Sequence, residues 1–175
     1  YHASLTLSPR GFTDVELAGR DLFIAGGNRV LHYDTTLPAD PFDLGGESFY
    51  TSDGAPAYVN SIAVEDSLLI VGTTDGLRVL RIDESRELVP LARTSVAELG
   101  GEPGQMLVDG SDLWVSLPEE HRIVLVELAS GRFQATHQFA TVDLQGESIT
   151  PGDLLIERDT MLVSAGEGAR VIAYG

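Results

Sequence analysis

The sequence predicts an all-β protein, a β-propeller with four four-stranded blades. Three observations favour this fold: a short apolar run occurs four times, each run is followed by a polar turn and then by Arg, and no segment carries a helical period. The runs begin 46, 45 and 48 residues apart, and a fixed period in this range is typical of a repeat architecture. They are Leu22–Ala25, Leu68–Val71, Leu113–Ser116 and Met161–Ser164.

Four strands are expected in each repeat. The runs are rich in β-branched and aromatic residues and are bounded by turn residues, which favours strands, and each turn leads into a second strand. In the second repeat Asp75-Gly76 supplies residues that tolerate positive φ in a tight hairpin. A fourth strand is clear at Glu87–Arg93 and Arg132–Phe139 and weaker after Tyr33. The expected upstream strands are Asp14–Leu17, Ser61–Val64, Gln105–Val108 and Asp153–Ile156.

The four blades are expected at residues 11–52, 59–95, 104–140 and 152–175, within a single domain over 1–175. The last blade lacks a fourth strand, and residues 2–7 at the N-terminus are expected to complete it and close the ring. Closure would remove an exposed sheet edge. The alternative is a longer propeller, favoured by a first residue that is Tyr1 and by the small blade number.

Residues 59–94 resemble the LVIVD-type repeat of bacterial and archaeal surface proteins. The resemblance rests on the turn-strand Asp75-Gly76-Leu77-Arg78-Val79, on Asp83 in the next turn and on Pro90 in the outer strand. Elsewhere Gly131 replaces the Pro-containing segment, and Trp114 and Pro118 depart from the pattern. The resemblance implies a propeller outside the cell, and it implies no catalytic residues.

Composition narrows the classes of partner. The formal net charge is −16, all 11 basic residues are Arg, and there is no Cys. Such a surface repels nucleic acid and anionic lipid, so neither is expected as a partner. Apolar stretches of about five residues are far too short to cross a membrane. The acidity fits solubility, with salt adaptation or cation binding as alternatives.

Acidic residues are expected to gather on one face of the propeller. Loops that join second to third strands, and loops between blades, lie on the same face. There the pattern acid-Leu-Gly/Gln-Gly-Glu-Ser/Pro occurs at residues 43–48, 98–103 and 143–148. Oxygen ligands that converge in this way would suit Ca²⁺ or Mg²⁺. The candidate ligands are Glu47, Glu102, Glu147, Asp14 and Asp153.

Two alternatives explain the same acidic residues without a metal. The glutamates are either solvated turn residues or structural partners of a recurring Arg column. That column, Arg29, Arg78, Arg122 and Arg170, is expected to tie hairpins to neighbouring loops.

The first connection between blades carries about ten extra residues within 48–60. Binding residues concentrate in loops on rigid scaffolds, so this insertion is a candidate contact surface for a protein or small ligand. The alternative is a loop that folds back over the channel mouth. The candidate residues are Phe49, Tyr50, Asp53 and Tyr58 in the insertion, with His121 in another loop of the same face.

These observations favour a non-catalytic interaction module of a secreted, periplasmic or surface protein, without a cofactor. The alternative is a calcium-dependent, lactonase-like hydrolase with its metal in the central channel. No nucleophile elbow of the form Gly-x-Ser-x-Gly and no phosphate-binding loop is present.

Overall fold

The computed structural model describes residues 11–128, 133, 135–141, 147–157 and 160–165. Within them, antiparallel strands form three four-stranded sheets and one two-stranded sheet, each in chain order. The first sheet contains β1 (Phe12–Ala18), β2 (Asp21–Gly26), β3 (Arg29–Asp34) and β4 (Phe42–Ser48). The second contains β5 (Val59–Glu65), β6 (Leu68–Thr73), β7 (Gly76–Ile82) and β8 (Leu88–Ser95). One helical turn, α1 (Val96–Leu99), follows the second sheet.

The third sheet contains β9 (Met106–Asp109), β10 (Asp112–Leu117), β11 (Arg122–Glu127) and β12 (Ala135–Ala140). The fourth contains β13 (Pro151–Glu157) and β14 (Thr160–Ala165). The predicted strands of the first three repeats, including the weak fourth strand of the first repeat, are therefore confirmed. The expected N-terminal strand at 2–7 and the last strand after residue 165 lie outside the described residues.

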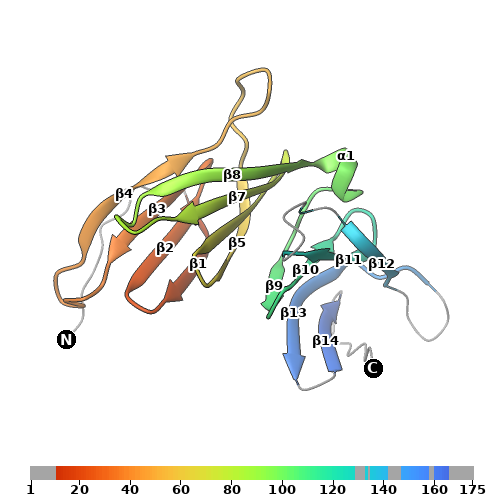
Figure 1. Ribbon diagram of the computed structural model, residues 1–175. Helices are drawn as coiled ribbons and strands as arrows, with labels where there is room; N and C mark the ends of the chain where they lie inside the picture. The colour runs from red at the N-terminus through yellow and green to blue at the C-terminus, as the bar shows by residue number, and fades with distance from the viewer. Residues whose placement is uncertain (1–10, 129–132, 134, 142–146, 158–159, 166–175) are drawn as a thin grey trace.

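The first strand of each sheet lies next to the first strand of the following sheet. β1 contacts β5, β5 contacts β9, and β9 contacts β13. The sheets thus succeed one another as blades with their inner strands together, and they form the arc visible in Figure 1. The predicted all-β propeller fold is confirmed. Among the described residues, no helix has the length and apolar character needed to span a membrane.

The second and third sheets each pack on a neighbour on both faces. Alternate residues of their strands therefore belong to two separate hydrophobic cores, because successive side chains of a strand point to opposite faces. In β6, Leu69 and Val71 pack toward the first sheet, against Phe23 and Val30. The residue between them, Ile70, packs toward the third sheet with a cluster that includes Leu113, Val115 and Val124. The opposite face of the third sheet, with Ile123 and Trp114, meets Met161 and Val163 of the fourth.

This packing corrects the sequence alignment of the repeats by one position. The sequence placed Leu68 level with Leu22 and Leu113, but Leu69 is the residue that packs toward the preceding sheet, as Leu113 does, whereas Leu68 packs toward the following sheet. The expected turn over residues 73–76 is present, because Thr73 pairs with Gly76 and leaves Thr74 and Asp75 as the two turn residues. Gly76 has φ +109° and lies against β8, where an added Cβ would be 2.1 Å from the Thr94 carbonyl oxygen.

The recurring Leu-Gly-Gly-Glu sequence adopts two different structures. In the first repeat it lies in β4, where Gly45 has φ +104° and the pairing register shifts. In the second repeat Gly100, with φ +94°, ends α1, whose first turn is closed by a capping box between Ser95 and Glu98. Glu47 is therefore a strand residue and not the loop residue that the sequence predicted.

An ion network joins the first and second sheets at the end remote from the β2–β3 turn. Arg86, in the β7–β8 turn, donates from Nε to Asp21 Oδ1 at 2.9 Å and also pairs with Asp34 at the end of β3. Asp21 Oδ1 is in turn 2.6 Å from Nε2 of His32, which is buried and stacks on Phe23. A charged turn of one blade thus holds the two central strands of its neighbour.

Candidate functional site

The connection between the first and second sheets is a hairpin over residues 49–58, called here the aromatic hairpin. Tyr50 and Pro56 form an isolated antiparallel bridge, and the Thr51 amide donates to the Ala55 carbonyl at 2.9 Å. Figure 1 shows this segment projecting beyond the ends of the sheets. It does not fold back as a cap over the inner strands.

Asp53 fixes the tip of the aromatic hairpin. Its Oδ1 accepts hydrogen bonds from the Thr51 hydroxyl and from the Ala55 amide, the latter at 3.3 Å. These bonds, the Thr51 hydroxyl first, hold the pKa of Asp53 below its ordinary value of 3.8. Gly54 provides the positive φ of +86° that the turn requires. The tip is therefore a closed turn held by an ionised carboxylate.

The base of the aromatic hairpin is anchored in the protein core. Phe49 and Ala57 are buried in the cluster between the first two sheets. Arg78 Nη2 donates to the Tyr50 carbonyl at 3.2 Å. Tyr58 exchanges two hydrogen bonds with Thr74, one from its amide to the Thr74 hydroxyl and one from the Thr74 amide to its carbonyl. These contacts fix the backbone on both sides of the turn.

Two tyrosine side chains are left at the surface by this arrangement. Tyr50 is 54% exposed and Tyr58 is 53% exposed, although their backbones are hydrogen-bonded. Phe49, the third aromatic candidate of this segment, is only 4% exposed and packs in the core between the first two sheets. An aromatic ring held on an ordered backbone loses little conformational entropy on binding, which is why tyrosines are common contact residues.

A cavity of about 420 Å³ lies beside the base of the aromatic hairpin. Its apolar walls come mainly from β7 and β8, and Phe49 belongs both to the wall and to the hairpin anchor. Its volume falls within the range of small-ligand pockets. The lining residues are Glu47, Phe49, Arg78, Val79, Leu80, Pro90, Leu91, Ala92 and Arg93.

Two arginines share one carboxylate at this cavity. Asp75, in the β6–β7 turn, pairs through Oδ2 with Arg78 and with Arg93 at 2.5 Å. The Arg78 side chain is 12% exposed, and its Nη1 is buried with no hydrogen-bond partner within the described part of the chain. Arg93 is 43% exposed and lies at the surface of the cavity. The wall therefore combines an apolar surface with a cationic edge.

The five carboxylates predicted as metal ligands do not come together. Within residues 11–128 and the described parts of 133–165, no group of three His, Asp or Glu side chains could hold an ion. Asp14 Oδ2 instead accepts from the Ile62 amide at 2.9 Å, which ties β1 to β5. Glu102 Oε1 accepts from Asn60 Nδ2 at 3.0 Å, which ties the loop before β9 to the second sheet.

The remaining candidates lie in separate places. Glu147 is exposed in the segment before β13, and the exposed Asp153 lies in β13, where its amide donates to the Ser164 hydroxyl. His121 has φ +50° in the β10–β11 turn, and its Nδ1 lies 3.3 Å from the Thr150 hydroxyl. Each is placed by its own turn or strand, and none lines the cavity beside the aromatic hairpin.

Sequence reasoning missed most of the cavity wall. It treated Arg78 as a structural residue, used Pro90 only for the repeat resemblance, and gave no role to Arg93 or Leu91. Arg93 and Leu91 lie on β8 and reach the cavity only because β8 pairs with β7 beside the end of β4. The recurring turn-Arg motif drew attention to Arg78, but nothing in the sequence joins Arg78 to Arg93 through Asp75.

Comparisons with known proteins identify the fold and no family. No family model and no curated protein matches the chain. Among solved structures, the computationally designed Ika8 protein matches with a TM-score of 0.66 and 14% identity over 98% of this chain and 48% of its own. The designed Ika4 protein matches with a TM-score of 0.65 and 16% identity over 99% of this chain and 97% of its own.

Natural proteins give matches of the same quality. The periplasmic gluconolactonase PpgL of Pseudomonas aeruginosa matches with a TM-score of 0.65 and 16% identity, over 87% of this chain and 50% of its own. A putative 6-phosphogluconolactonase of Bacteroides uniformis matches with a TM-score of 0.69 and 9% identity, over 86% and 48%. The chain thus spans about half the length of Ika8 and of these natural structures. At these identities the likeness defines the class of fold, a β-propeller, and nothing more specific.

Proposed function

We propose that the chain is a non-catalytic interaction module that binds a protein partner through the aromatic hairpin and the cavity beside it. The observation that carries this proposal is the pair Tyr50 and Tyr58, both more than half exposed on a hairpin whose tip and base are fixed by hydrogen bonds. Surface aromatics on an ordered loop have no role in the core of their own chain. They are the residue type that most often dominates protein interfaces.

The cavity supplies the second part of the proposed interface. Its walls suit an apolar side chain of the partner, and Arg93 at its edge suits a carboxylate or a main-chain carbonyl of the same segment. The strongly negative net charge of the chain disfavours acidic partners over most of its surface. We therefore expect a partner that is neutral or basic overall and that places an apolar residue in the cavity.

The test compares two matched double variants in partner capture. Tyr50→Ser with Tyr58→Ser removes the two exposed rings of the hairpin. Leu37→Ser with Phe42→Ser removes two apolar side chains that are somewhat more exposed, at 67% and 69%, at the opposite end of the first sheet. The wild type and the two variants are immobilised and incubated with protein fractions from a lysate of the source organism. The affinity of any captured protein for each of the three chains is then measured with purified components.

The hairpin variant is expected to weaken the partner's binding at least tenfold, because interfacial tyrosines commonly contribute about 1–2 kcal/mol each. The Leu37/Phe42 variant is expected to bind as the wild type does. The proposal is contradicted if the partner binds the hairpin variant and the Leu37/Phe42 variant with equal affinity. It is also contradicted if the immobilised wild type retains no protein. We also propose an extracytoplasmic location, which is supported only by the resemblance of residues 59–94 to surface-protein repeats.

The runner-up is a lactone hydrolase that uses Ca²⁺, and it is favoured by one observation. Several natural structures that match are described as gluconolactonases or putative 6-phosphogluconolactonases. The separation of Glu47, Glu102 and Asp14 into different contacts weighs against this alternative. Calorimetric titration with Ca²⁺ distinguishes the two proposals, since a hydrolase site would bind one ion per chain with an affinity that Glu102→Gln reduces.

A further inference from the structure

The arginines at the cavity beside the aromatic hairpin share too few carboxylates. Asp75 Oδ2 pairs with both Arg78 and Arg93, so one carboxylate serves two guanidinium groups, and these three side chains together carry one positive charge. In the network at the other end of the same two sheets the proportion is reversed, because Arg86 pairs with two carboxylates. In a chain with 27 acidic and 11 basic residues, a local shortage of carboxylates indicates a place for an anionic group from outside.

The two arginines differ in what they can offer to a ligand. Arg78 is largely buried and holds the Tyr50 carbonyl with Nη2, while its Nη1 is buried with no hydrogen-bond partner among the described residues. Arg93 is more exposed and donates to Asp75 from Nη2, and a guanidinium has five N–H donors, so Arg93 retains donors for a ligand. A carboxylate bound to Arg93 would leave Asp75 to Arg78 alone, and each arginine would then have its own anionic partner.

Glu47 restricts how much negative charge the cavity accepts. It lines the cavity from β4, whereas the two arginines line it from β7 and β8. The ion pairs of the described residues join Glu47 to neither arginine. Its carboxylate would repel a second acidic group in the same cavity. A ligand with a single carboxylate beside an apolar group therefore fits better than an acidic segment.

The apolar wall and the cationic edge lie within the reach of one residue. Leu91 and Arg93 are two positions apart on β8, and both line the cavity. In the C-terminal residue of a protein, the side chain and the main-chain carboxylate branch from the same Cα. In an extended internal segment, neighbouring side chains point to opposite faces, so an acidic residue next to an apolar one turns its carboxylate away.

We propose that the cavity binds the C-terminal residue of the partner protein, with an apolar side chain against Leu91 and the terminal carboxylate paired with Arg93. Capture of a C-terminal carboxylate is a recurring mode of peptide recognition. The site so defined rests on the proposed function, because it treats the aromatic hairpin and the cavity as one binding surface. All nine residues that line the cavity lie within residues 47–93, so two consecutive sheets form the whole site.

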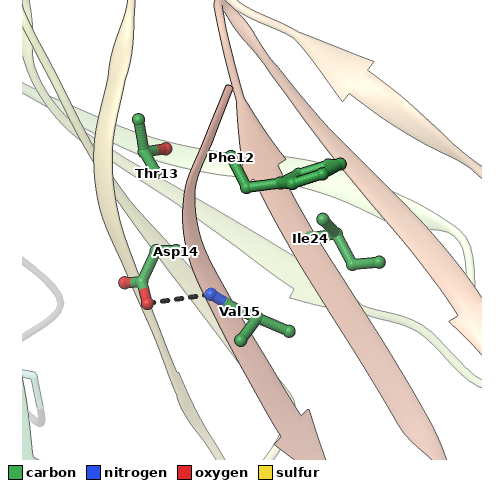
Figure 2. Close-up of a pocket in the computed structure, with 5 residues that line it drawn as sticks. All are labelled: Phe12, Thr13, Asp14, Val15 and Ile24. Atoms are coloured by element: carbon green, nitrogen blue, oxygen red, sulfur yellow. Dashed lines mark hydrogen bonds between the residues drawn. The ribbon is translucent and has the colours of Figure 1, made fainter. Parts of the chain in front are cut away.

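A second cavity of the chain lacks these features and provides a control. Figure 2 shows this cavity of about 450 Å³, lined by Phe12, Thr13, Asp14, Val15 and Ile24. None of the five is cationic, and the Asp14 carboxylate already accepts from the Val15 amide at 2.8 Å and from the Ile62 amide at 2.9 Å. A ligand carboxylate would meet only another carboxylate there.

Peptides that differ only at the C-terminus test the proposal on the unmodified chain. The wild type is incubated with hexapeptides of varied sequence that are tethered through their N-termini and end in Leu, Val, Phe, Ser or Asp. Each peptide is made as the free acid and as the carboxamide. We expect the retained peptides to be free acids that end in an apolar residue, and to bind at least about tenfold more weakly as carboxamides. Added NaCl should weaken the acid and leave the amide unchanged, because screening acts on the charge pair.

Three single variants assign this preference to the cavity. Arg93→Gln should bind the acid and the amide equally, because its side chain no longer carries the charge that distinguishes them. Arg81→Gln removes an exposed arginine of β7 that does not line the cavity, and Val15→Ser alters the second cavity. Both should keep the wild-type preference for the acid.

The outcomes separate this site from the proposed function of the hairpin. The proposal is overturned if the wild type binds acid and amide equally, prefers internal acidic residues, or retains no peptide. If a peptide binds equally in both forms but loses affinity in the Tyr50→Ser, Tyr58→Ser variant, the hairpin interface stands and the terminal carboxylate does not. If the preference for the acid persists and the two tyrosines have no effect, the cavity site is supported and the role of the hairpin is contradicted.

Discussion

At the residue scale, single polar residues join the first three sheets to one another. Asp14 holds the Ile62 amide, Glu102 holds Asn60, and Arg86 holds Asp21 and Asp34. All these links connect positions more than 40 residues apart, so the sequence indicated that the carboxylates matter without indicating their partners. It predicted a metal for Asp14, and a metal, an arginine or solvent for Glu102, whereas the structure supplies the Ile62 amide to Asp14 and the Asn60 side chain to Glu102.

Asp34 makes the stability of the fold depend on acid pH. Hydrogen bonds from the Thr36 hydroxyl and amide, with the Arg86 pair, lower the pKa of Asp34 from 3.8 to about 2. Because the folded-state pKa is below the unfolded one, the stabilisation is complete above about pH 4 and is lost as the pH falls toward 2. We expect the melting temperature of Asp34→Asn to fall less than that of the wild type between pH 5 and 2.5.

The control for this prediction is Asp40→Asn, which removes the same charge from an exposed position in the same loop. Its melting temperature should follow the wild-type pH dependence. If Asp34→Asn also follows the wild-type curve, the carboxylate of Asp34 contributes nothing specific to the stability of the folded state.

At the element scale, the tight β6–β7 hairpin depends on one glycine. Gly76 combines φ +109° with a close approach to the Thr94 carbonyl oxygen and to Ser95 of β8. We expect Gly76→Ala to lower the free energy of unfolding by about 2 kcal/mol or more, since backbone strain and a main-chain collision act together. Urea denaturation measures the loss.

Gly19 provides the matched comparison. It has φ +62° in the β1–β2 turn, but an added Cβ there would meet nothing within 4 Å. Gly19→Ala therefore carries the cost of a left-handed backbone alone, about 1 kcal/mol. Equal losses for the two variants would mean that the contact between Gly76 and β8 does not constrain the hairpin.

The strands could be predicted from the sequence because their period and turn residues are local properties. Register could not be predicted to the same accuracy. Leu68 and Leu69 are both leucines, and only the core that each one contacts decides which belongs to the repeat column. The two Leu-Gly-Gly-Glu segments were not distinguished, since the features that separate them, the Ser95–Glu98 capping box and the pairing of β4 with β3, lie outside these four shared residues.

At the scale of the whole molecule, the repeat period predicted the propeller, and the arrangement of its loops located the aromatic hairpin. Tyr50, Tyr58 and Asp53 were identified because an insertion stands out against a regular repeat. The cavity wall from β8 was not identified. It depends on how one sheet packs beside the next, which a single sequence does not encode in its local pattern.

The most direct test of the proposed function asks whether the whole chain catalyses. Hydrolysis of gluconolactone is followed at neutral pH with the purified chain and millimolar Ca²⁺, against buffer with the same Ca²⁺. A binding module is expected to leave the rate at that of the buffer, and a chelator is expected to change nothing. Saturable hydrolysis that the chelator abolishes and that Glu102→Gln reduces would contradict the proposal and assign the chain to the hydrolases.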